Sequence, residues 1–316
     1  MNRVCEILEV EYPIIEGGLA YVGNGLLAAA VSEGGGFGQV GTAGRTVENF
    51  EKQILLAAEA TSKPFGVNVP ISQHTDYTPY IEVIDKYKHV IKAVSLGAGN
   101  PKALIPVIKD MGLKVLVLTS TAFHSQKAEK LGADMIICEG YEAGGSNGPS
   151  ELTTMTLVPQ VKRAVSIPVV AAGGIVDGKS MAAAMVLGAD GVQLGTRFVA
   201  TKECEAHDNF KRAIIEAQDV STEIITRMLK GPIRVLKNNY SKKVQEVEKE
   251  HRSLDAVLPM VRGKYNKLAM FDGQIEDGFM SCGQVASLID HLESAEDVVK
   301  QIAKESKACF EKAYVY

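Results

Sequence analysis

The chain alternates short apolar runs with segments whose apolar residues recur at helical spacing. Most of the apolar runs are continuous rather than alternating, which is typical of parallel strands that are buried on both faces. They predict eight strands, at residues 12–18, 36–41, 64–70, 90–99, 113–120, 133–140, 167–174 and 189–196. The segments between them, such as residues 100–112 and 156–166, have the period of amphipathic helices.

Internal repetition supports this alternation. The segments "EKLGADMIICEG" and "MVLGADGVQLGT" share one frame, in which a helix end is followed by Leu-Gly-Ala-Asp, a strand and a glycine. Gly112, Gly132 and Gly188 are predicted to end helices, because glycine readily adopts the left-handed conformation found at such ends. Eight strand–helix units favour an α/β fold of the (β/α)8 TIM barrel type over a doubly wound open sheet, for which an opening GxGxxG fingerprint is missing.

The last third of the chain is different. The segment "VQEVEKEHRSLDAV" is charged and has helical spacing, and "VRGKYNKLAMFDGQIEDGFMSCGQ" is irregular and contains several glycines. We therefore predict a barrel in residues 1–220, a helical excursion over the barrel mouth in residues 221–270, and closing helices in residues 271–316 that complete the barrel. The excursion is consistent either with a substrate lid or with a plain pair of surface helices.

The composition narrows the class of protein. The 316 residues are 46% hydrophobic with a net charge of -4, and no basic cluster suggests a nucleic-acid partner. The N-terminus is too short and too charged for a signal peptide, and no apolar run is long enough to span a membrane. Five scattered cysteines without a CxxC pair fit a reducing, cytoplasmic location, and no residue spacing resembles a metal site.

Glycine pairs follow several of the predicted strands. Barrel sites are built from these loops, and glycine lets backbone N–H groups approach an anion closely. Gly173-Gly174 after the seventh strand and Gly195-Thr196 after the eighth lie where barrels usually hold a phosphate group. The spacing therefore predicts a phosphate-bearing ligand at this end of the barrel.

Several motifs in combination make the chain resemble one enzyme family over nearly its whole length. They are "YPIIEGGLAYVGNGLLAAAVSEGGGFG", "GVNV", "GAGNP", "EGYEAGG", "LTTMTLVPQV", "IPVVAAGGIVDG", "GVQLGTRFVATKE" and "MSCGQ". They resemble the family of nitronate monooxygenases (2-nitropropane dioxygenase-like) and FMN-dependent enoyl-ACP reductases. The segments "KECEAHDNFKRAI" and "VLKN" are more similar to the enoyl-reductase branch. The resemblance implies a TIM barrel that binds FMN at its mouth, with NADH or NADPH as electron donor.

The resemblance also implies which residues contact FMN. Residues expected along the flavin ring and the ribityl chain are Gly17, Gly18, Leu19, Asn68, Glu139, Ala143, Gly144 and Gly145. Residues expected to hold the phosphate are Gly173, Gly174, Gly195 and Thr196. Residues expected to close over the flavin are Met280, Gly283 and Gln284. The polar side chains of this set suit hydrogen bonding to the flavin heteroatoms.

Three positions depart from the pattern of the family. Glu16 stands where the family commonly has glutamine, and a carboxylate near the flavin would disfavour its anionic reduced form unless neutralised. Cys282 stands where the reductase branch usually has a small apolar residue. Ser146 replaces a histidine that is associated, in the monooxygenases, with substrate binding or proton removal. Because serine has no acid–base pKa near neutrality without an activating partner, we expect Ser146 to be a polar substrate contact, with Asn147 as a second polar group.

Two other histidines are candidates for the missing acid–base group. His74 follows the third predicted strand and His124 follows the fifth, which places both at the carboxyl end of the barrel. Each is also consistent with a loop histidine that has no role in catalysis.

These observations leave several functions open. The leading hypothesis is an FMN-dependent oxidoreductase in which NADH or NADPH provides electrons to reduce an activated alkene such as a 2-enoyl thioester. The alternatives are nitronate oxidation with oxygen, another flavin reaction on an unsaturated acid or quinone, and a flavin-binding accessory protein with a decayed active site. A small-molecule or acyl-thioester substrate is the expected partner, and a homodimer is the candidate assembly. We expect no nucleic-acid or membrane partner.

Overall fold

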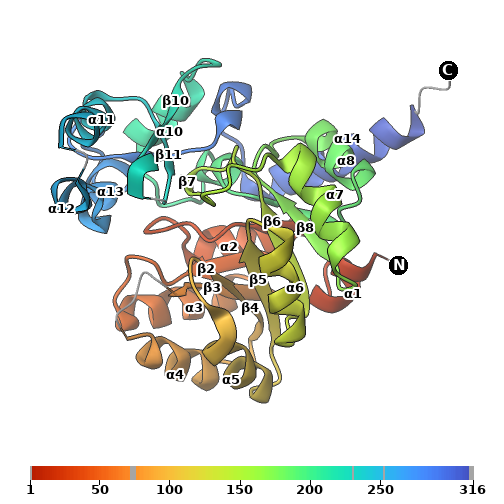
Figure 1. Ribbon diagram of the computed structural model, residues 1–316. Helices are drawn as coiled ribbons and strands as arrows, with labels where there is room; N and C mark the ends of the chain where they lie inside the picture. The colour runs from red at the N-terminus through yellow and green to blue at the C-terminus, as the bar shows by residue number, and fades with distance from the viewer. Residues whose placement is uncertain (1, 72–75, 230, 252, 313–316) are drawn as a thin grey trace.

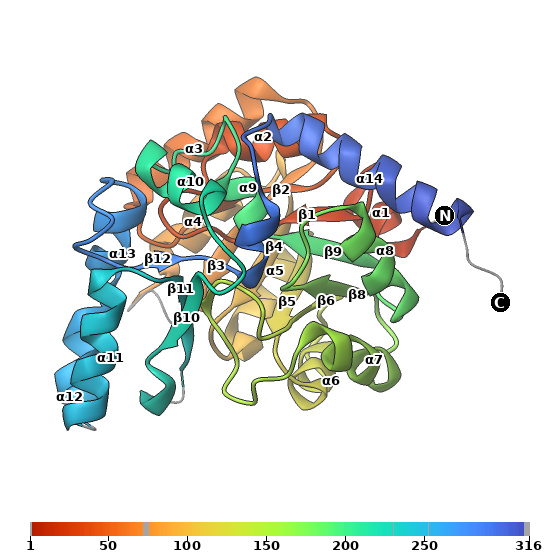
Figure 2. The ribbon, with the colours of Figure 1, turned by 90° about the horizontal axis from the view of Figure 1, so that it is seen from above.

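The computed structural model describes residues 2–71, 76–229, 231–251 and 253–312. Eight parallel strands form a barrel in the order β1-β9-β8-β6-β5-β4-β3-β2 (Figure 2). The strands are β1 (Ile14–Glu16), β2 (Gly38–Gly41), β3 (Phe65–Pro70), β4 (Ile91–Gly97), β5 (Lys114–Thr119), β6 (Met135–Glu139), β8 (Val169–Ala172) and β9 (Gly191–Leu194). The barrel closes next to β2, where the N–H of Phe37 donates to the carbonyl of Ile14 at 2.8 Å. The predicted TIM barrel is confirmed, and each predicted run contains one strand.

A ring of helices covers the outside of the barrel (Figure 1). The helices that follow the barrel strands are α2 (Gly25–Glu33), α3 (Val47–Ala60), α4 (Thr78–Lys86), α5 (Leu104–Asp110), α6 (Ala122–Lys130), α7 (Thr154–Ala164), α8 (Gly178–Val186) and α14 (Ala295–Glu311). Helix α14 packs against both α8 and α2 and so completes the ring. The shorter helical elements are α9 (Thr196–Val199), α10 (Asp208–Ile215), η2 (Pro101–Ala103) and η5 (Gln284–Leu288).

The N-terminal helix plugs one end of the barrel. Helix α1 (Arg3–Leu8) places Val4 and Leu8 in the same buried apolar cluster as the inward-facing side chains of the strands. Asn2 Nδ2 donates to the carbonyl of Asp190, just before β9, at 2.7 Å. The helix therefore covers the amino ends of the strands, and the carboxyl ends stay available for a site.

The two repeated segments fold in the same way. Gly132 and Gly188 have φ angles of 100° and 108°, so both helix ends are left-handed, as predicted. The aspartate of each repeat then accepts from a backbone N–H near the start of the neighbouring strand. Asp134 Oδ2 accepts from Val115 N at 2.8 Å, and Asp190 Oδ2 accepts from Val169 N at 2.9 Å. The repeat thus fixes the register of adjacent strands.

The excursion lies beside the barrel mouth (Figure 1). Its helical elements are α11 (Asn239–His251), α12 (Leu254–Val257), α13 (Gly263–Met270), η3 (Arg227–Leu229) and η4 (Leu258–Val261). It also contains the antiparallel strands β10 (Thr222–Ile225) and β11 (Ile233–Leu236), which the helical expectation did not include. Strand β11 pairs in addition with β12 (Met280–Ser281) and with β7 (Gly145–Ser146). These pairings join the excursion to the barrel loop that carries Ser146.

Among the described residues, no helix combines the length and the apolar character that crossing a membrane requires.

Candidate functional site

A cavity of about 1050 Å³ lies at the carboxyl ends of the barrel strands. Its walls come from the loops after the strands and from the excursion, which adds Val261, Gly263, Asn266 and Met270. The cavity brings together most of the predicted site residues from distant parts of the sequence. They are Gly17, Gly18, Leu19, Asn68, His124, Glu139, Ala143, Gly144, Gly145, Ser146, Gly173, Gly174, Gly195, Thr196 and Gly283. His74 lies outside the described residues.

The loops after β8 and β9 combine unpaired backbone N–H groups with open space. Gly173 and Gly174 have φ angles of 86° and 75°, which favour glycine. Among the hydrogen bonds between described residues, none is donated by the N–H of Gly174 or of Gly195. A Cβ atom on Gly195 would meet no protein atom closer than Leu19 Cδ2, at 3.6 Å. Free donors next to open space fit an anionic group such as the phosphate of FMN.

The carboxylate of Glu142 lies near these loops but is already held by the protein. Its two oxygens each accept from the N–H of Thr154 at 3.0 Å, at the start of α7. The hydroxyl of Thr154 lies 2.7 Å from the carbonyl of Gly173. These contacts tie the loop after β6, the start of α7 and the glycine turn after β8 into one unit.

Two other glycines let the cavity walls approach each other. A Cβ atom on Gly18 would lie 2.2 Å from the side chain of Asn68. A Cβ atom on Gly144 would lie 2.6 Å from the backbone of Cys282 and Gly283. Such distances are well inside van der Waals contact, so a larger residue at either position would push the walls apart.

Side-chain amides line the cavity, among them those of Asn68, Asn147 and Gln193. Asn68 Nδ2 donates to Ser95 Oγ at 2.8 Å, which fixes this amide on β3. Asn147 Nδ2 donates to the carbonyl of Ala143 at 2.9 Å, and its buried Oδ1 has no partner among the described residues. Gln193 was not among the predicted residues, although the sequence shows a polar residue within the apolar strand β9. Amides both donate and accept, so this set fits the heteroatoms of a flavin ring.

Glu139 ends β6 and lines the same cavity. Burial raises the pKa of its carboxyl group to about 8, from an ordinary value of 4.5. The group is therefore mostly protonated at neutral pH, where it can donate a hydrogen bond. A neutral carboxyl adds no negative charge next to a flavin.

Glu16 points away from the cavity, contrary to the expectation of a carboxylate near the flavin. Ile15 faces the inside of the barrel, so the alternation of the strand turns Glu16 outward, under the surrounding helices. Its side chain is fully buried, and Oε2 accepts from the N–H of Gln39 at 3.0 Å. Burial raises the pKa of this carboxyl well above its ordinary value, although the hydrogen bond from Gln39 and the charge of Arg45 oppose the shift.

The segment around β12 lies against the cavity, but only alternate residues face it. Those that line the cavity are Phe279, Ser281, Gly283 and Val285. Met280 packs into the buried core and Gln284 is exposed, and neither residue is part of the cavity wall, so their expected contacts with the flavin stay a prediction. In β12 successive side chains point to opposite sides, which separates Met280 from Ser281, while Gln284 begins the 3-10 helix η5.

Ser146 stands at the rim of the cavity. With Gly145 it forms β7, which pairs with Ile233 and Arg234 of β11. Its side chain is exposed, so the hydroxyl is open to a ligand that enters from the mouth. This place agrees with a substrate contact rather than with a contact deep in the barrel.

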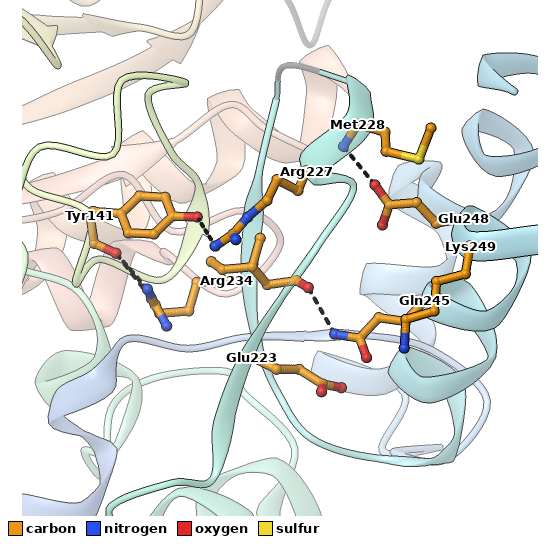
Figure 3. A pocket seen from close by; sticks show the side chains of 9 residues that line it. Tyr141, Glu223, Arg227, Met228, Arg234, Gln245, Glu248 and Lys249 are labelled. Carbon is orange, nitrogen blue, oxygen red and sulfur yellow. Dashed lines mark hydrogen bonds between the residues drawn. The ribbon is translucent and has the colours of Figure 1, made fainter. Parts of the chain in front are cut away.

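Arg234 anchors the loop that leads to Ser146 (Figure 3). Its Nε and Nη2 donate to the carbonyl of Tyr141 at 3.0 and 2.9 Å. The guanidinium group is 5.1 Å from the centre of the Tyr141 ring. A second pocket, of about 820 Å³, lies on this side of β11 between Tyr141, the β10–β11 hairpin and α11. Arg234 therefore links this pocket to the loop of the main cavity.

His124 lines an outer part of the cavity from the first turn of α6. It is exposed, and its Nδ1 lies 2.7 Å from the hydroxyl of Thr121, the residue that caps the helix. His124 therefore lies at the cavity, but not in the part of the wall that is formed by Glu139 and the glycine-containing loops after β6, β8 and β9.

Similarity to known proteins agrees with this geometry. The family model described as nitronate monooxygenase matches residues 1–92 and 75–305. The chain belongs to this family. A probable nitronate monooxygenase from Staphylococcus saprophyticus is 31% identical, and the alignment covers 95% of this chain and 97% of that protein. A (3aS,4S,5R,7aS)-5-hydroxy-7a-methyl-1-oxo-octahydro-1H-indene-4-carboxyl-CoA dehydrogenase from Mycobacterium tuberculosis is 29% identical, with coverage of 96% and 95%.

A solved structure gives a further match. FabK from Thermotoga maritima superposes with a TM-score of 0.92 at 39% identity, covering 99% of this chain and 98% of that chain. The protein is therefore a flavin-dependent oxidoreductase, and its family implies FMN as the cofactor. The predicted family and the predicted enzyme class are confirmed.

Proposed function

We propose that this protein reduces an activated alkene, such as a 2-enoyl thioester, with electrons from NADH or NADPH that pass through FMN. The observation that carries the proposal is the match along 99% of the chain to FabK, which agrees with the motifs that resemble FMN-dependent enoyl-ACP reductases. The reaction adds a hydride to the β-carbon and a proton to the α-carbon. It needs a polarised carbonyl and a proton source, and it needs no strong base.

The residues that would hold FMN form two groups. The free N–H groups of Gly174 and Gly195 fit the phosphate, and the amides of Asn68, Asn147 and Gln193 fit the ring. When bound, FMN supplies the two-electron chemistry that no amino-acid side chain provides. The cavity, at about 1050 Å³, is at the upper end of the range for ligand pockets, which leaves space for a second molecule beside the cofactor.

Two side chains along the cavity hold a proton at neutral pH. Burial raises the pKa of the Tyr21 phenol and brings that of the Glu139 carboxyl to about 8. Both residues line the cavity. Like water, they can supply the proton that the α-carbon receives.

Ser146 supports this reaction as a binding group. Its exposed hydroxyl at the rim can donate a hydrogen bond to a substrate carbonyl, while its ordinary acidity prevents it from acting as a base. A serine is also smaller than the histidine usual in the family, so the mouth above the loop is wider. This favours a substrate that is longer than a small nitronate.

Nitronate oxidation with oxygen is the second candidate. It is favoured by the family model and by the name of the relative from S. saprophyticus. A nitronate is already an anion, so this reaction also proceeds without a base.

Anaerobic spectroscopy distinguishes the two reactions. We expect the purified protein to contain FMN, and NADH or NADPH to bleach its visible band in the absence of oxygen. A 2-enoyl thioester should then restore the band. If no enoyl thioester restores it while nitronate turnover with oxygen is fast, the protein is a monooxygenase and the proposal is rejected.

A further inference from the structure

We call the outer branch that part of the cavity wall that is formed by residues 97–102 at the end of β4, residues 118–120 at the end of β5 and one face of α6. This face carries His124, Lys127 and Ala128 of α6, and Leu131, which follows the last residue of the helix. They are three or four positions apart, which places them on one side of a helix. Ala128 is buried and Leu131 is half-buried, so the floor of the outer branch is apolar.

The outer branch is basic, although the chain as a whole has a net charge of -4. Lys102, Lys127 and Lys130 line it, and all three side chains are exposed. None of these lysines forms an ion pair with another described residue. The ammonium group of Lys127 lies 4.2 Å from the centre of the Phe123 ring, which holds it near the branch without neutralising it. Three unpaired cations around one groove attract an anion.

No carboxylate among the described residues lines the outer branch. The two carboxylates of the cavity wall, Glu139 and Glu142, belong to β6 and to the loop after it. The flavin phosphate has its own place at the loops after β8 and β9, which are separated from β4 and β5 by β6 in the barrel order. The basic groups of the outer branch are therefore left for a different anion.

We propose that the outer branch binds the phosphate end of the phosphopantetheine arm that carries an acyl thioester. This inference rests on the proposed function, because it concerns the part of the same substrate that carries the acyl group. The arm is an extended chain of alkyl and amide groups that ends in a phosphate. The apolar floor fits the alkyl groups, Asn100 offers an amide partner, and the lysines fit the phosphate. The thioester at the other end of the arm then reaches toward the flavin side of the cavity.

The test compares two substrates that differ by one phosphate, crotonyl-pantetheine and crotonyl-phosphopantetheine, with the FMN-loaded enzyme. The variant carries Lys127→Glu and Lys130→Glu. The control is Lys179→Glu, an exposed lysine on α8 that is outside the cavity. We expect the wild type and the control to have at least a tenfold lower KM for the phosphorylated substrate. The double variant should lose this advantage and keep the kcat and KM for crotonyl-pantetheine. Added salt should reduce the advantage in the wild type.

Three results would overturn the inference. In the first, the wild type has the same KM for both substrates. In the second, the double variant keeps the lower KM for the phosphorylated substrate. In the third, the substitutions raise the KM of NADPH instead, and this result would assign the outer branch to the electron donor. A preference that appears only with crotonyl-CoA would assign the lysines to the nucleotide phosphates and reject the pantetheine phosphate.

A binding measurement separates this inference from the proposed function. Butyryl-pantetheine and butyryl-phosphopantetheine cannot be reduced, and their binding is followed by the change in the flavin absorption spectrum. A phosphate preference that the double variant loses, without any turnover of crotonyl thioesters, would support the outer branch and reject the reaction. Turnover without a phosphate preference would support the reaction and reject the outer branch.

Discussion

Gly195→Asp should abolish FMN binding without disturbing the fold. Gly195 has a φ of -110°, outside the left-handed region, so a side chain causes no backbone strain of that kind. The nearest protein atom to a new Cβ is Leu19 Cδ2 at 3.6 Å, an ordinary contact. A loss of FMN affinity in this variant would therefore be due to the group that binds in front of Gly195, and not to unfolding of the protein.

The size of the effect follows from the charges. Two unit charges about 5 Å apart, at an effective dielectric constant of about 20, repel each other by about 3 kcal/mol. A phosphate carries more than one charge, so FMN should bind more than about a hundredfold more weakly to Gly195→Asp. Gly195→Asn is the matched control, because it has nearly the same shape without the charge and should lose far less affinity.

The assay is a titration of the apoprotein with FMN, followed by the quenching of flavin fluorescence. The melting temperature of both apoproteins should stay close to that of the wild type. If Asp and Asn at position 195 bind FMN equally well, no phosphate lies at this loop and the assignment of the cofactor site is refuted.

Three further predictions follow from the site. Ser146→Ala should remove one hydrogen bond, about 0.5–1.5 kcal/mol, and so reduce kcat/KM about two- to tenfold with unchanged FMN content; a thousandfold loss would mean that Ser146 transfers a proton. The pKa of Glu139 is about 8 in the folded protein, above its ordinary value of 4.5. Between pH 4.5 and 8 the folded apoprotein therefore binds more protons than the unfolded chain, and its stability falls as the pH rises through this range. Glu139→Gln should therefore raise the melting temperature increasingly from pH 5 to 8, and a pH-independent difference would contradict the shift. Arg234→Ala should lower the free energy of unfolding by about 1–3 kcal/mol and speed amide hydrogen exchange in residues 141–147, because both bonds to Tyr141 are lost; unchanged exchange there would show that Arg234 does not hold the loop.

The barrel could be predicted because continuous apolar runs indicate its strands and the helical spacing of apolar residues indicates its helices. Gly132 and Gly188 marked the helix ends for the same local reason. The strands β10 and β11 could not be predicted in this way. Each has only four residues, and β11 is stabilised by pairing with the distant strands β7 and β12, while β10 depends on its pairing with β11.

The sequence predicted those parts of the candidate site that consist of glycine-containing loops. It did not predict which side chains of a segment point into the cavity. Motifs placed the segment around β12 against the cavity, but they could not show that Met280 and Gln284 point away from it. The direction of the Glu16 side chain could not be predicted either, since β1 is buried on both faces. Gln193 was visible in the sequence only as a polar residue in a buried strand, which has structural explanations as well as functional ones.

The most direct test of the central claim is the stoichiometry of an anaerobic reaction. The purified, FMN-loaded protein is mixed with NADPH or NADH and crotonyl-phosphopantetheine, and both substrates and the saturated product are quantified. The proposed function predicts that nucleotide oxidation and butyryl-phosphopantetheine formation are equimolar, and that both stop when FMN is removed. Nucleotide oxidation only after oxygen is admitted, with no saturated thioester formed, would contradict it.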